Sequence, residues 1–592
     1  MYQETPAQSK ERQTARTSAS VPEISYTVSM AKPWTHLLEV EMRVKQKGAE
    51  STQLKMPVWT PGSYLVREYA RHVQDFVVKD GGGKTLTWEK TNKNTWSIDT
   101  KGSSELIATY RVYANELTVR TNELNDNHAF WNNAALLMFP AGQLAAPATV
   151  KVIPYEKWKI ATGLPVAGTN TFRAPNFDIL YDSPFEVSNF NEISFDVKGK
   201  PHRFVISGEG NYDLKKIAVD TAKIVEEGYK IFGELPYDNY TFILNLRGGG
   251  GLEHLNSTAL QWNSFSFAPE SKYKDFLHLV AHEYFHLWNV KRIRPDALGP
   301  FDYENENYTK MLWVAEGGTA YYEGLLLRRA GLITDKEFLE GKASLIEQLQ
   351  ARPGRFETSL EEASYDAWIK YYRQDENAIN NQVSYYDKGE IVNMMLDVTI
   401  RTASGGKRSY DDVLRYLYNE FYKKNRNYGP QDFQKAAEMA ADTSLDDFFS
   451  KYVRGESEID FDGIVKGIGL ELREENKNKG KAYFGANLVD DNGRLIVRTI
   501  PAGTPAFDQG INTGDQIVAI DGYRASIAFL DSYLSERKPG DKVTVTVFRF
   551  DKLREMPMVL GENKKADLSF VPLASPSDAQ RSLYEGYLES KL

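Results

Sequence analysis

The sequence LHLVAHEYFHLWNV at residues 277–290 carries two histidines four positions apart, His282 and His286, with Glu283 directly after the first. Apolar residues recur around them at helical spacing, so we expect a helix over 274–290. Positions i and i+4 share one face of a helix, which lets both imidazoles bind a single metal ion. Glu283 then points toward a water on that ion and can accept its proton. The stretch predicts a catalytic metal site on a helix.

A catalytic zinc ion usually has a third protein ligand and one position left for water. The segment LWVAEGGTAYYEGLLLRRAG at 312–331 supplies a candidate, Glu316, which lies 30 residues after His286 in a helical and apolar context. A carboxylate is costly to bury there unless it binds a cation or a partner. Glu316 also precedes two glycines, where a neighbouring helix can approach closely. Glu323 is the competing candidate, and we expect it beside the site or at the surface.

His278 lies one turn before His282 but lacks an adjacent carboxylate. We therefore expect it to be a packed imidazole, or one that supports a ligand, rather than a ligand itself. An ordinary amphipathic helix with hydrogen-bonded histidines is the alternative for the whole motif. The chain has only eight histidines, and four of them fall between 254 and 286, which favours the metal site.

The composition is that of a folded protein, with 41% hydrophobic, 12% aromatic and 26% charged residues. At about 150 residues per domain, 592 residues suggest roughly four domains. No apolar stretch is long enough to cross a bilayer. The net charge of −9, without a long basic run, argues against a nucleic-acid partner. Cysteine is absent, which excludes disulfides, thiol nucleophiles and cysteine-ligated metals.

The pattern of apolar and polar residues changes along the chain. Residues 22–200 mostly alternate between apolar and polar, as expected for an antiparallel β domain, and helical patterns dominate from about 272 to 450. Alternation returns beyond 465. Residues 1–21 read as a polar linker without the apolar core of a signal peptide. Because such a lead resembles a segment after a cleavage site, we expect a periplasmic or secreted protein, with a cytoplasmic one as the alternative.

Several motifs together resemble one known family. HEYFHLWNVKRIRP at 282–295, the segment 312–331, and WTPGSYLVREYAR at 59–71 are similar to the PDZ-bearing glycyl aminopeptidases, a branch of the gluzincin zinc metallopeptidases. The resemblance covers nearly the whole chain. It implies a multidomain α+β fold and one Zn²⁺ per chain, held by the three ligands named above. The implied parts are a linker (1–21), an N-terminal β domain (22–200), a thermolysin-like catalytic domain (201–325), an α-helical domain (326–462), a PDZ domain (463–568) and a C-terminal tail (569–592).

The glycine-rich segment GGGGLEHLNS at 248–257 is a candidate substrate-binding strand. Gly250 and Gly251 let backbone approach a substrate closely, and an edge strand can pair with a peptide. Resemblance to the Gly-x-Met-Glu-Asn motif of related aminopeptidases gives Glu253 the role of binding the substrate ammonium, although His254 replaces the asparagine. The alternative is a glycine-rich loop with a solvated glutamate. A phosphate-binding loop is disfavoured, because no Lys-Ser/Thr pair follows the glycines.

Two further residues are carried over by the resemblance. In VSYYDKGEIVNMMLD at 383–397, the Tyr-x-Lys-Gly pattern selects Tyr386 over Tyr385 as the hydrogen-bond donor to the oxyanion. In DSPFEV at 182–187, a loose likeness nominates Glu186 as a second carboxylate for the substrate amine, with an ordinary surface glutamate as the alternative.

The C-terminal region is expected to be a PDZ domain. AYFGANL at 482–488 resembles its carboxylate-binding loop, and PAGTPAFDQGINTGDQIVAIDG at 501–522 resembles its central segment. Such a domain can dock the C-terminal segment of a peptide, or it can serve as a lid or packing module that binds nothing else.

The resemblance therefore implies a zinc aminopeptidase that acts on peptides with a free N-terminus and a small first residue, glycine preferred and then alanine. Glu283 and Tyr386 are its catalytic residues, with Glu283 activating a zinc-bound water. Two alternatives stay open: a zinc endopeptidase with the same chemistry, and a catalytically inactive PDZ scaffold. The intact Glu283 argues against the scaffold.

Overall fold

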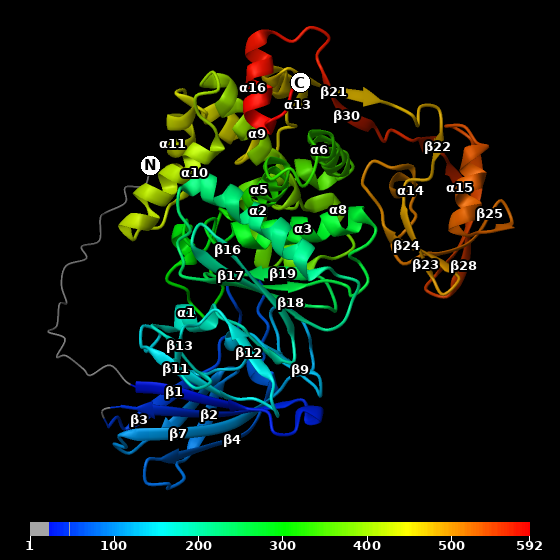
Figure 1. The fold of residues 1–592 in the computed structure, drawn as a ribbon. Helices are drawn as coiled ribbons and strands as arrows, with labels where there is room; N and C mark the ends of the chain where they lie inside the picture. The colour runs from blue at the N-terminus through cyan, green and yellow to red at the C-terminus, as the bar shows by residue number, and fades with distance from the viewer. Residues whose placement is uncertain (1–22, 47) are drawn as a thin grey trace, which may run out of the picture.

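The computed structural model describes residues 23–46 and 48–592, so the predicted linker at 1–21 lies outside the described residues. The β domain, a mixed α/β and helical body, and the PDZ domain follow one another along the chain, with the PDZ domain to one side of the body (Figure 1). None of the helices in the described residues is long and apolar enough to cross a membrane. The predicted multidomain α+β architecture is confirmed.

The N-terminal domain is built from mostly antiparallel sheets whose alternating residues form a core of their own. Its largest sheet has the order β13-β14-β11-β1-β2-β7-β4, and two smaller sheets have the orders β10-β3-β6-β5 and β12-β15-β9-β8. The strands are β1 (Glu23–Ser29), β2 (Leu37–Lys45), β3 (Ser51–Lys55), β4 (Val73–Asp80), β5 (Trp88–Asn92), β6 (Thr95–Asp99), β7 (Glu105–Tyr113), β8 (Glu123–Leu124), β9 (His128–Trp131), β10 (Phe139–Pro140), β11 (Ala148–Ile153), β12 (Lys159–Thr162), β13 (Val166–Gly168), β14 (Thr171–Ala174) and β15 (Phe185–Ser188), with helix α1 (Phe177–Tyr181).

The catalytic domain has a mixed sheet of order β16-β17-β18-β20-β19, in which β19 is an edge strand. Its elements are β16 (Asn191–Val197), β17 (Lys200–Ser207), α2 (Leu214–Phe232), β18 (Tyr240–Asn245), β19 (Gly250–Glu253), β20 (Ser257–Gln261), α3 (Glu270–Phe285), α4 (Leu312–Ala315) and α5 (Gly317–Arg329). The β16–β17 hairpin spans the boundary that we predicted at 200. Strand β16 alternates between apolar and polar residues like the strands of the β domain. The sequence pattern alone therefore assigns β16 to that domain.

The helical domain shares one hydrophobic core with the catalytic domain, so the predicted division at 325/326 falls inside α5 and inside that core. Its helices are α6 (Asp335–Gln350), α7 (Leu360–Tyr365), α8 (Ala378–Asn381), α9 (Asp387–Ala403), α10 (Tyr410–Glu420), α11 (Pro430–Ala441), α12 (Asp446–Tyr452) and α13 (Phe461–Val465). The helix expected over 274–290 begins at Glu270 and ends at Phe285. Beyond it the backbone turns, and Val290 adopts a positive φ of 115°.

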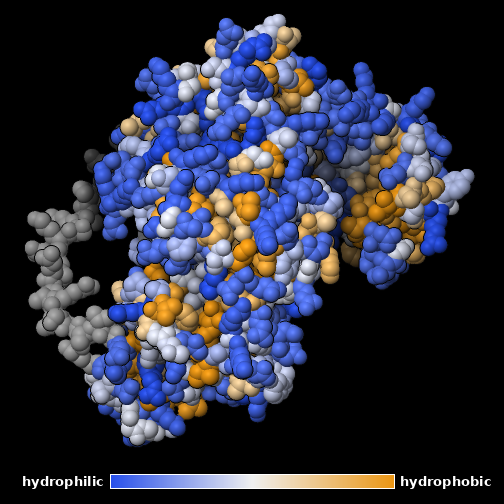
Figure 2. Space-filling model, in the orientation of Figure 1, coloured by the Kyte–Doolittle hydropathy of each residue, from blue (hydrophilic) through white to orange (hydrophobic). Residues whose placement is uncertain are grey.

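The PDZ domain has a separate small core and a sheet of order β23-β24-β25-β27-β28, in which β23 is an edge strand. Its elements are β22 (Ala482–Tyr483), β23 (Asn487–Asp491), β24 (Arg494–Thr499), α14 (Pro505–Asp508), β25 (Gln516–Ile520), β26 (Tyr523–Arg524), α15 (Ile527–Ser535), β27 (Lys542–Arg549), β28 (Lys552–Val559) and β29 (Gly561–Glu562). Figure 2 shows a hydrophobic patch on this domain, whose exposed apolar side chains include Phe507, Ile527 and Phe550.

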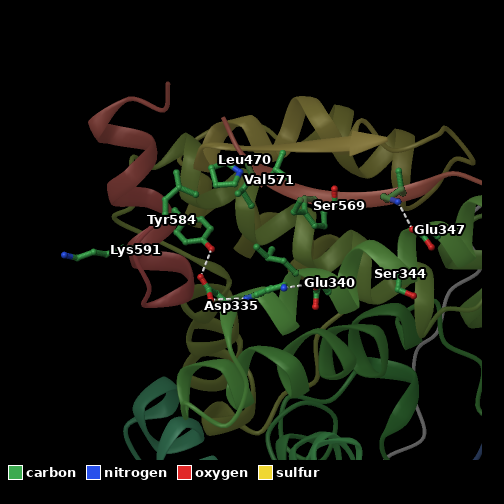
Figure 3. A pocket seen from close by; sticks show the side chains of 15 residues that line it. Asp335, Glu340, Ser344, Glu347, Leu470, Ser569, Val571, Tyr584 and Lys591 are labelled. Carbon is green, nitrogen blue, oxygen red and sulfur yellow. Dashed lines mark hydrogen bonds and ion pairs between the residues drawn. The ribbon is translucent and has the colours of Figure 1, made fainter. Parts of the chain in front are cut away.

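A two-stranded ribbon of β21 (Leu470–Glu475) and β30 (Asp567–Pro572) joins the PDZ domain to the body. The residues predicted as a C-terminal tail therefore contain most of β30 and a helix, α16 (Asp578–Leu588), which packs against the body. Figure 3 shows the hollow between this ribbon, α16 and α6. The Leu568 amide donates to Glu347 at 2.6 Å, and the Tyr584 hydroxyl donates to Asp335 at 3.1 Å, which anchors the ribbon and α16 to α6.

Candidate active site

Helix α3 and the start of α5 bring two imidazoles and a carboxylate to one point. His286 Nε2 lies 3.2 Å from Glu316 Oε2, His282 Nε2 lies 3.8 Å from the same oxygen, and the two Nε2 atoms are 3.1 Å apart. All three side chains are largely or fully buried. Such convergence of ligand atoms fits a divalent metal ion with three protein ligands. Burial opposes ionisation of Glu316, but His286 and His282 outweigh burial and lower the pKa of its carboxyl to about 2.

The opposite nitrogen of each imidazole is held by a fixed acceptor. His282 Nδ1 lies 2.7 Å from Glu323 Oε2, and His286 Nδ1 lies 2.9 Å from the Asn289 carbonyl oxygen. These bonds place the proton on Nδ1 and leave Nε2 free to bind a cation. Glu323 also contacts His278 Nδ1 at 3.2 Å, so the structure places both residues beside the cluster and not in it.

A close contact between two helices sets the position of Glu316. A Cβ on Gly317 would lie 2.6 Å from the Gly389 Cα and 2.6 Å from the Tyr385 carbonyl oxygen, so α5 and α9 touch through their backbones. This contact brings Tyr386, at the N-terminus of α9, to the cavity lined by the three candidate metal ligands. The Tyr386 and His282 ring centroids are 6.3 Å apart, whereas the Tyr385 ring is buried away from that cavity.

Glu283 lies beside the three candidate metal ligands and next to strand β19. Its Oε2 is buried without a hydrogen-bond partner in the described chain, which leaves it available to a water. Burial raises the pKa of the Glu283 carboxyl to about 7; the two imidazoles oppose this, and Glu253 and Glu316 add to it. A Cβ on Gly251 would lie 2.2 Å from Glu283 Oε1, so only glycine at this position lets β19 approach the carboxylate.

Glu253 ends strand β19 and is 4% exposed. A carboxylate oxygen of Glu253, one of Glu283 and a nitrogen of His286 all lie within 4.8 Å of one another. The β domain covers this end of the cavity: a Cβ on Gly62 would lie 2.6 Å from Glu253 Oε2. The whole cavity measures about 360 Å³, and Gly250, Gly251 and Tyr386 are among its lining residues.

The structure does not bring Glu186 to this cavity. Glu186 lies on β15 with no exposed surface, and its Oε2 is 3.4 Å from His128 Nδ1, while His128 Nε2 contacts Glu123 at 2.8 Å. The nomination therefore fails, because the pairing of β15 with β9 directs this side chain into a cluster inside the β domain. Another residue of the same segment, Asp182, supports the site instead. It accepts from the Leu255 amide at 2.8 Å and contacts His254 at 3.1 Å.

Sequence reasoning missed two residues that line the cavity from the β domain. Gly62 belongs to the motif at 59–71, which we used only for the resemblance, so its glycine was the available signal. Arg120 follows β7 in a segment without a recognisable pattern, and its Nη2 lies 3.4 Å from the Gly251 carbonyl oxygen. A loop residue that reaches a site in another domain leaves no local trace in the sequence.

Comparisons with known proteins agree with this geometry. Residues 25–189 match the Peptidase M61 N-terminal domain, residues 275–392 match the M61 glycyl aminopeptidase family, and residues 468–559 match the PDZ domain. Among solved structures, an aminopeptidase N family protein from Idiomarina loihiensis is 30% identical, with a TM-score of 0.89, over 95% of this chain and 100% of that chain.

The M1 zinc metallopeptidase from Deinococcus radiodurans is 13% identical, with a TM-score of 0.48, over 74% of this chain and 94% of that chain, and this distant likeness supports nothing further. No curated protein matched the chain. The family match over the catalytic helices and the likeness in fold over nearly the full length lead to one conclusion. The chain belongs to the M61 glycyl aminopeptidase family and is a metallopeptidase of the aminopeptidase class whose catalytic domain is followed by a PDZ domain.

Proposed function

We propose that the protein removes small N-terminal residues, glycine first and then alanine, from peptides with a free N-terminus, using one Zn²⁺ per chain. Two imidazoles and one carboxylate are a common ligand set for a catalytic zinc site. His282, His286 and Glu316 would hold the ion. Zinc bound there supplies Lewis-acid activation of a water and of the scissile carbonyl.

Glu283 and Tyr386 carry the proton chemistry and the charge stabilisation. The unpartnered Oε2 of Glu283 accepts a proton from the attacking water, and the same carboxyl then returns the proton to the leaving amine. The Tyr386 hydroxyl donates a hydrogen bond to the oxyanion that develops on the scissile carbonyl. Burial raises the pKa of Tyr386 well above its ordinary value, so it stays a donor at neutral pH.

The position of Glu253 is the observation that carries the aminopeptidase assignment. Its carboxylate lies next to Glu283 at the end of the cavity that Gly62 closes, where it can pair with an ammonium group. A charge pair in such a buried place fixes register, so that the first peptide bond lies beside Glu283. The close approach of the Gly62 loop leaves little room for a first side chain, which supports the preference for glycine and alanine.

A panel of aminoacyl p-nitroanilides, tested with and without a chelator, measures this proposal. Glycyl and alanyl substrates should be hydrolysed fastest, and N-acetyl-glycyl substrates should be poor. Glu253→Gln should lower kcat/KM for free-amine substrates by about 10²-fold, or roughly 2.7 kcal/mol, with unchanged metal content.

Glu270→Gln is the matched control, because Glu270 lies on the same helix as Glu283 but is exposed and outside the cavity. If the wild-type protein cleaves blocked peptides as fast as free ones, the endopeptidase with the same chemistry replaces this proposal. If it cleaves none of them with metal bound, the inactive scaffold replaces it.

We also propose that the PDZ domain docks the C-terminal segment of a peptide along β23. This strand has one unpaired edge, and the preceding loop contains Gly485 with a positive φ of 88°. Titration of labelled peptides, with a free or amidated C-terminus, against the full chain tests this. Equal affinity for both forms would remove the carboxylate from the recognition. A periplasmic or secreted location stays a prediction.

A further inference from the structure

The active-site cavity contains a positive group that the proposed function does not use. Arg120 comes from the β domain and lines the same cavity as Glu253, Glu283 and the metal cluster. Its Nη2 donates to the Gly251 carbonyl oxygen at 3.4 Å, a long hydrogen bond, and its Nε is buried without a partner in the described chain. The Tyr69 hydroxyl donates to the Arg120 carbonyl oxygen at 2.8 Å, which holds the backbone of this residue in place.

A second arginine of the β domain, Arg67, is not among the residues that line this cavity. Arg67 donates to the Ser63 hydroxyl oxygen at 2.9 Å through Nη2. Burial lowers the pKa of the Arg67 guanidinium.

Within the described residues, neither guanidinium has a carboxylate oxygen at ion-pair distance, Glu253 included. A partly buried cation without a counter-charge is costly, because it has lost water and gained no partner. Some other buried cations have a carboxylate partner, as Lys291 has in Asp182 at 2.6 Å, whereas Arg292 bonds only carbonyl oxygens. Arg120 differs from both because it lines a cavity that a ligand can enter. The Arg120 guanidinium therefore provides a place for an anionic group that arrives with a ligand.

Gly251 shows where the Arg120 guanidinium lies relative to the peptide bond that is cleaved. A Cβ on Gly251 would point at Glu283, the proposed base, while the Gly251 carbonyl oxygen accepts from Arg120. One residue of β19 thus separates the base from the guanidinium. Consecutive Cα atoms of an extended peptide are about 3.8 Å apart. A carboxylate one residue beyond the scissile bond can therefore reach the Arg120 guanidinium while that bond lies beside Glu283. Glu253 binds the amine at the closed end, which leaves the leaving-group side to Arg120.

We propose that Arg120 binds a carboxylate on the leaving-group side of the substrate, so that the preferred substrates are short glycyl peptides with an anionic group one residue after the scissile bond. This inference rests on the aminopeptidase function proposed above. The carboxylate comes either from the C-terminus of a dipeptide or from an acidic side chain in the second residue. A guanidinium binds a carboxylate through two parallel hydrogen bonds, which gives both affinity and orientation.

Three substrates separate these sources: Gly-Leu, Gly-Leu-amide and Gly-Glu-amide. For the wild-type protein, kcat/KM for Gly-Leu should exceed that for Gly-Leu-amide by about 10–100-fold, the range expected for a charge-assisted hydrogen bond. If the side-chain carboxylate of Gly-Glu-amide also reaches Arg120, kcat/KM for Gly-Glu-amide should equal that for Gly-Leu. If it does not, kcat/KM for Gly-Glu-amide should equal that for Gly-Leu-amide. In Arg120→Gln the preference for acid over amide should fall to within threefold, and Arg120→Lys should keep an intermediate preference, because a lysine retains the charge but not the planar fork.

Arg173→Gln is the matched control, since Arg173 is an exposed arginine of the same domain on β14. Melting temperatures report whether each variant is folded. Calorimetric titration of Gly-Leu and Gly-Leu-amide into the chelator-treated protein measures the same preference without catalysis.

Two results would overturn the inference: equal kcat/KM for acid and amide in the wild-type protein, or an unchanged preference in folded Arg120→Gln. Glycyl p-nitroanilide keeps this outcome distinct from failure of the proposed function. If the wild-type protein hydrolyses the anilide but treats acid and amide alike, only the carboxylate site is wrong. If it does not hydrolyse the anilide, the aminopeptidase function fails first.

Discussion

Strands β19 and β23 are both edge strands beside which an extended peptide can lie, yet their surroundings differ. Strand β19 ends in a buried carboxylate, faces Glu283 and is covered by loops of the β domain. Strand β23 has no fully buried residue and packs against a small separate core. Both edges leave backbone groups open to an extended peptide, but only β19 is also surrounded by charged side chains from two domains. The chemistry proposed above depends on those side chains.

The two strands differ as well in how they are attached. The core beneath the catalytic helices extends into the helical domain, whereas the PDZ core is separate and its domain reaches the body through the β21–β30 ribbon. Substitutions around β19 should therefore change hydrolysis, and equivalent substitutions in the PDZ domain should leave it nearly unaltered.

The largest effect is expected at Glu283. Glu283→Gln keeps the shape of the side chain but cannot accept a proton, so kcat should fall by about 10⁴-fold, the upper end for a general base. Metal content, measured by elemental analysis, should equal that of the wild-type protein because Glu283 is not one of the three proposed ligands His282, His286 and Glu316. Activity within tenfold of the wild-type value would remove Glu283 from the role of base.

A smaller loss is expected at Tyr386. Tyr386→Phe removes the hydrogen bond that we propose for the developing oxyanion alone, so kcat should fall by about 10²–10³-fold with little change in KM. Tyr385→Phe is the matched comparison, since its hydroxyl is buried without a partner. A larger defect at Tyr385 would show that the wrong ring was chosen, and a change in KM alone would point to substrate binding.

A pair of glycines tests the comparison between the two regions directly. Gly62 and Gly503 have positive φ values of 84° and 74°, so alanine strains the backbone at both. Only at Gly62 would the new Cβ meet a functional group, 2.6 Å from Glu253 Oε2, whereas at Gly503 nothing lies within 4 Å. Gly62→Ala should lower kcat/KM for glycyl p-nitroanilide by about 10–100-fold, and Gly503→Ala should stay near the wild-type value. Equal activities would show that the Gly62 loop does not set the position of Glu253.

The sequence was informative wherever a single helix or a short motif carried the signal. The spacing of His282 and His286 on one helix required only the helical period, and Glu316 followed from a carboxylate in an apolar segment before two glycines, which the structure shows in contact with α9. Glu186 was wrong because its direction depends on which strand pairs with β15. Arg120 was not found, because its position at the cavity depends on the packing of one domain against another.

The smallest effect is expected where the PDZ domain contacts the body. The Asn380 amide donates to the Ile500 carbonyl oxygen at 3.0 Å and accepts from the Ala502 amide at 2.7 Å, which ties the PDZ domain to α8. These bonds lie six residues before Tyr386 in the sequence. If the PDZ domain only holds peptide, its release should leave the cavity intact, because Tyr386 is fixed by the contact between Gly317 and Gly389.

Asn380→Ala should therefore change kcat/KM for glycyl p-nitroanilide by less than about threefold, while protease cleavage in the β21–β30 ribbon becomes faster as the domain detaches. Asn381→Ala, an exposed neighbour on the same short helix, is the control for effects on α8 itself. A loss of tenfold or more in Asn380→Ala, with Asn381→Ala unchanged, would mean that the docked PDZ domain positions Tyr386. Catalysis beside β19 would then not be independent of peptide binding at β23, and peptide binding at β23 would become a means of controlling hydrolysis.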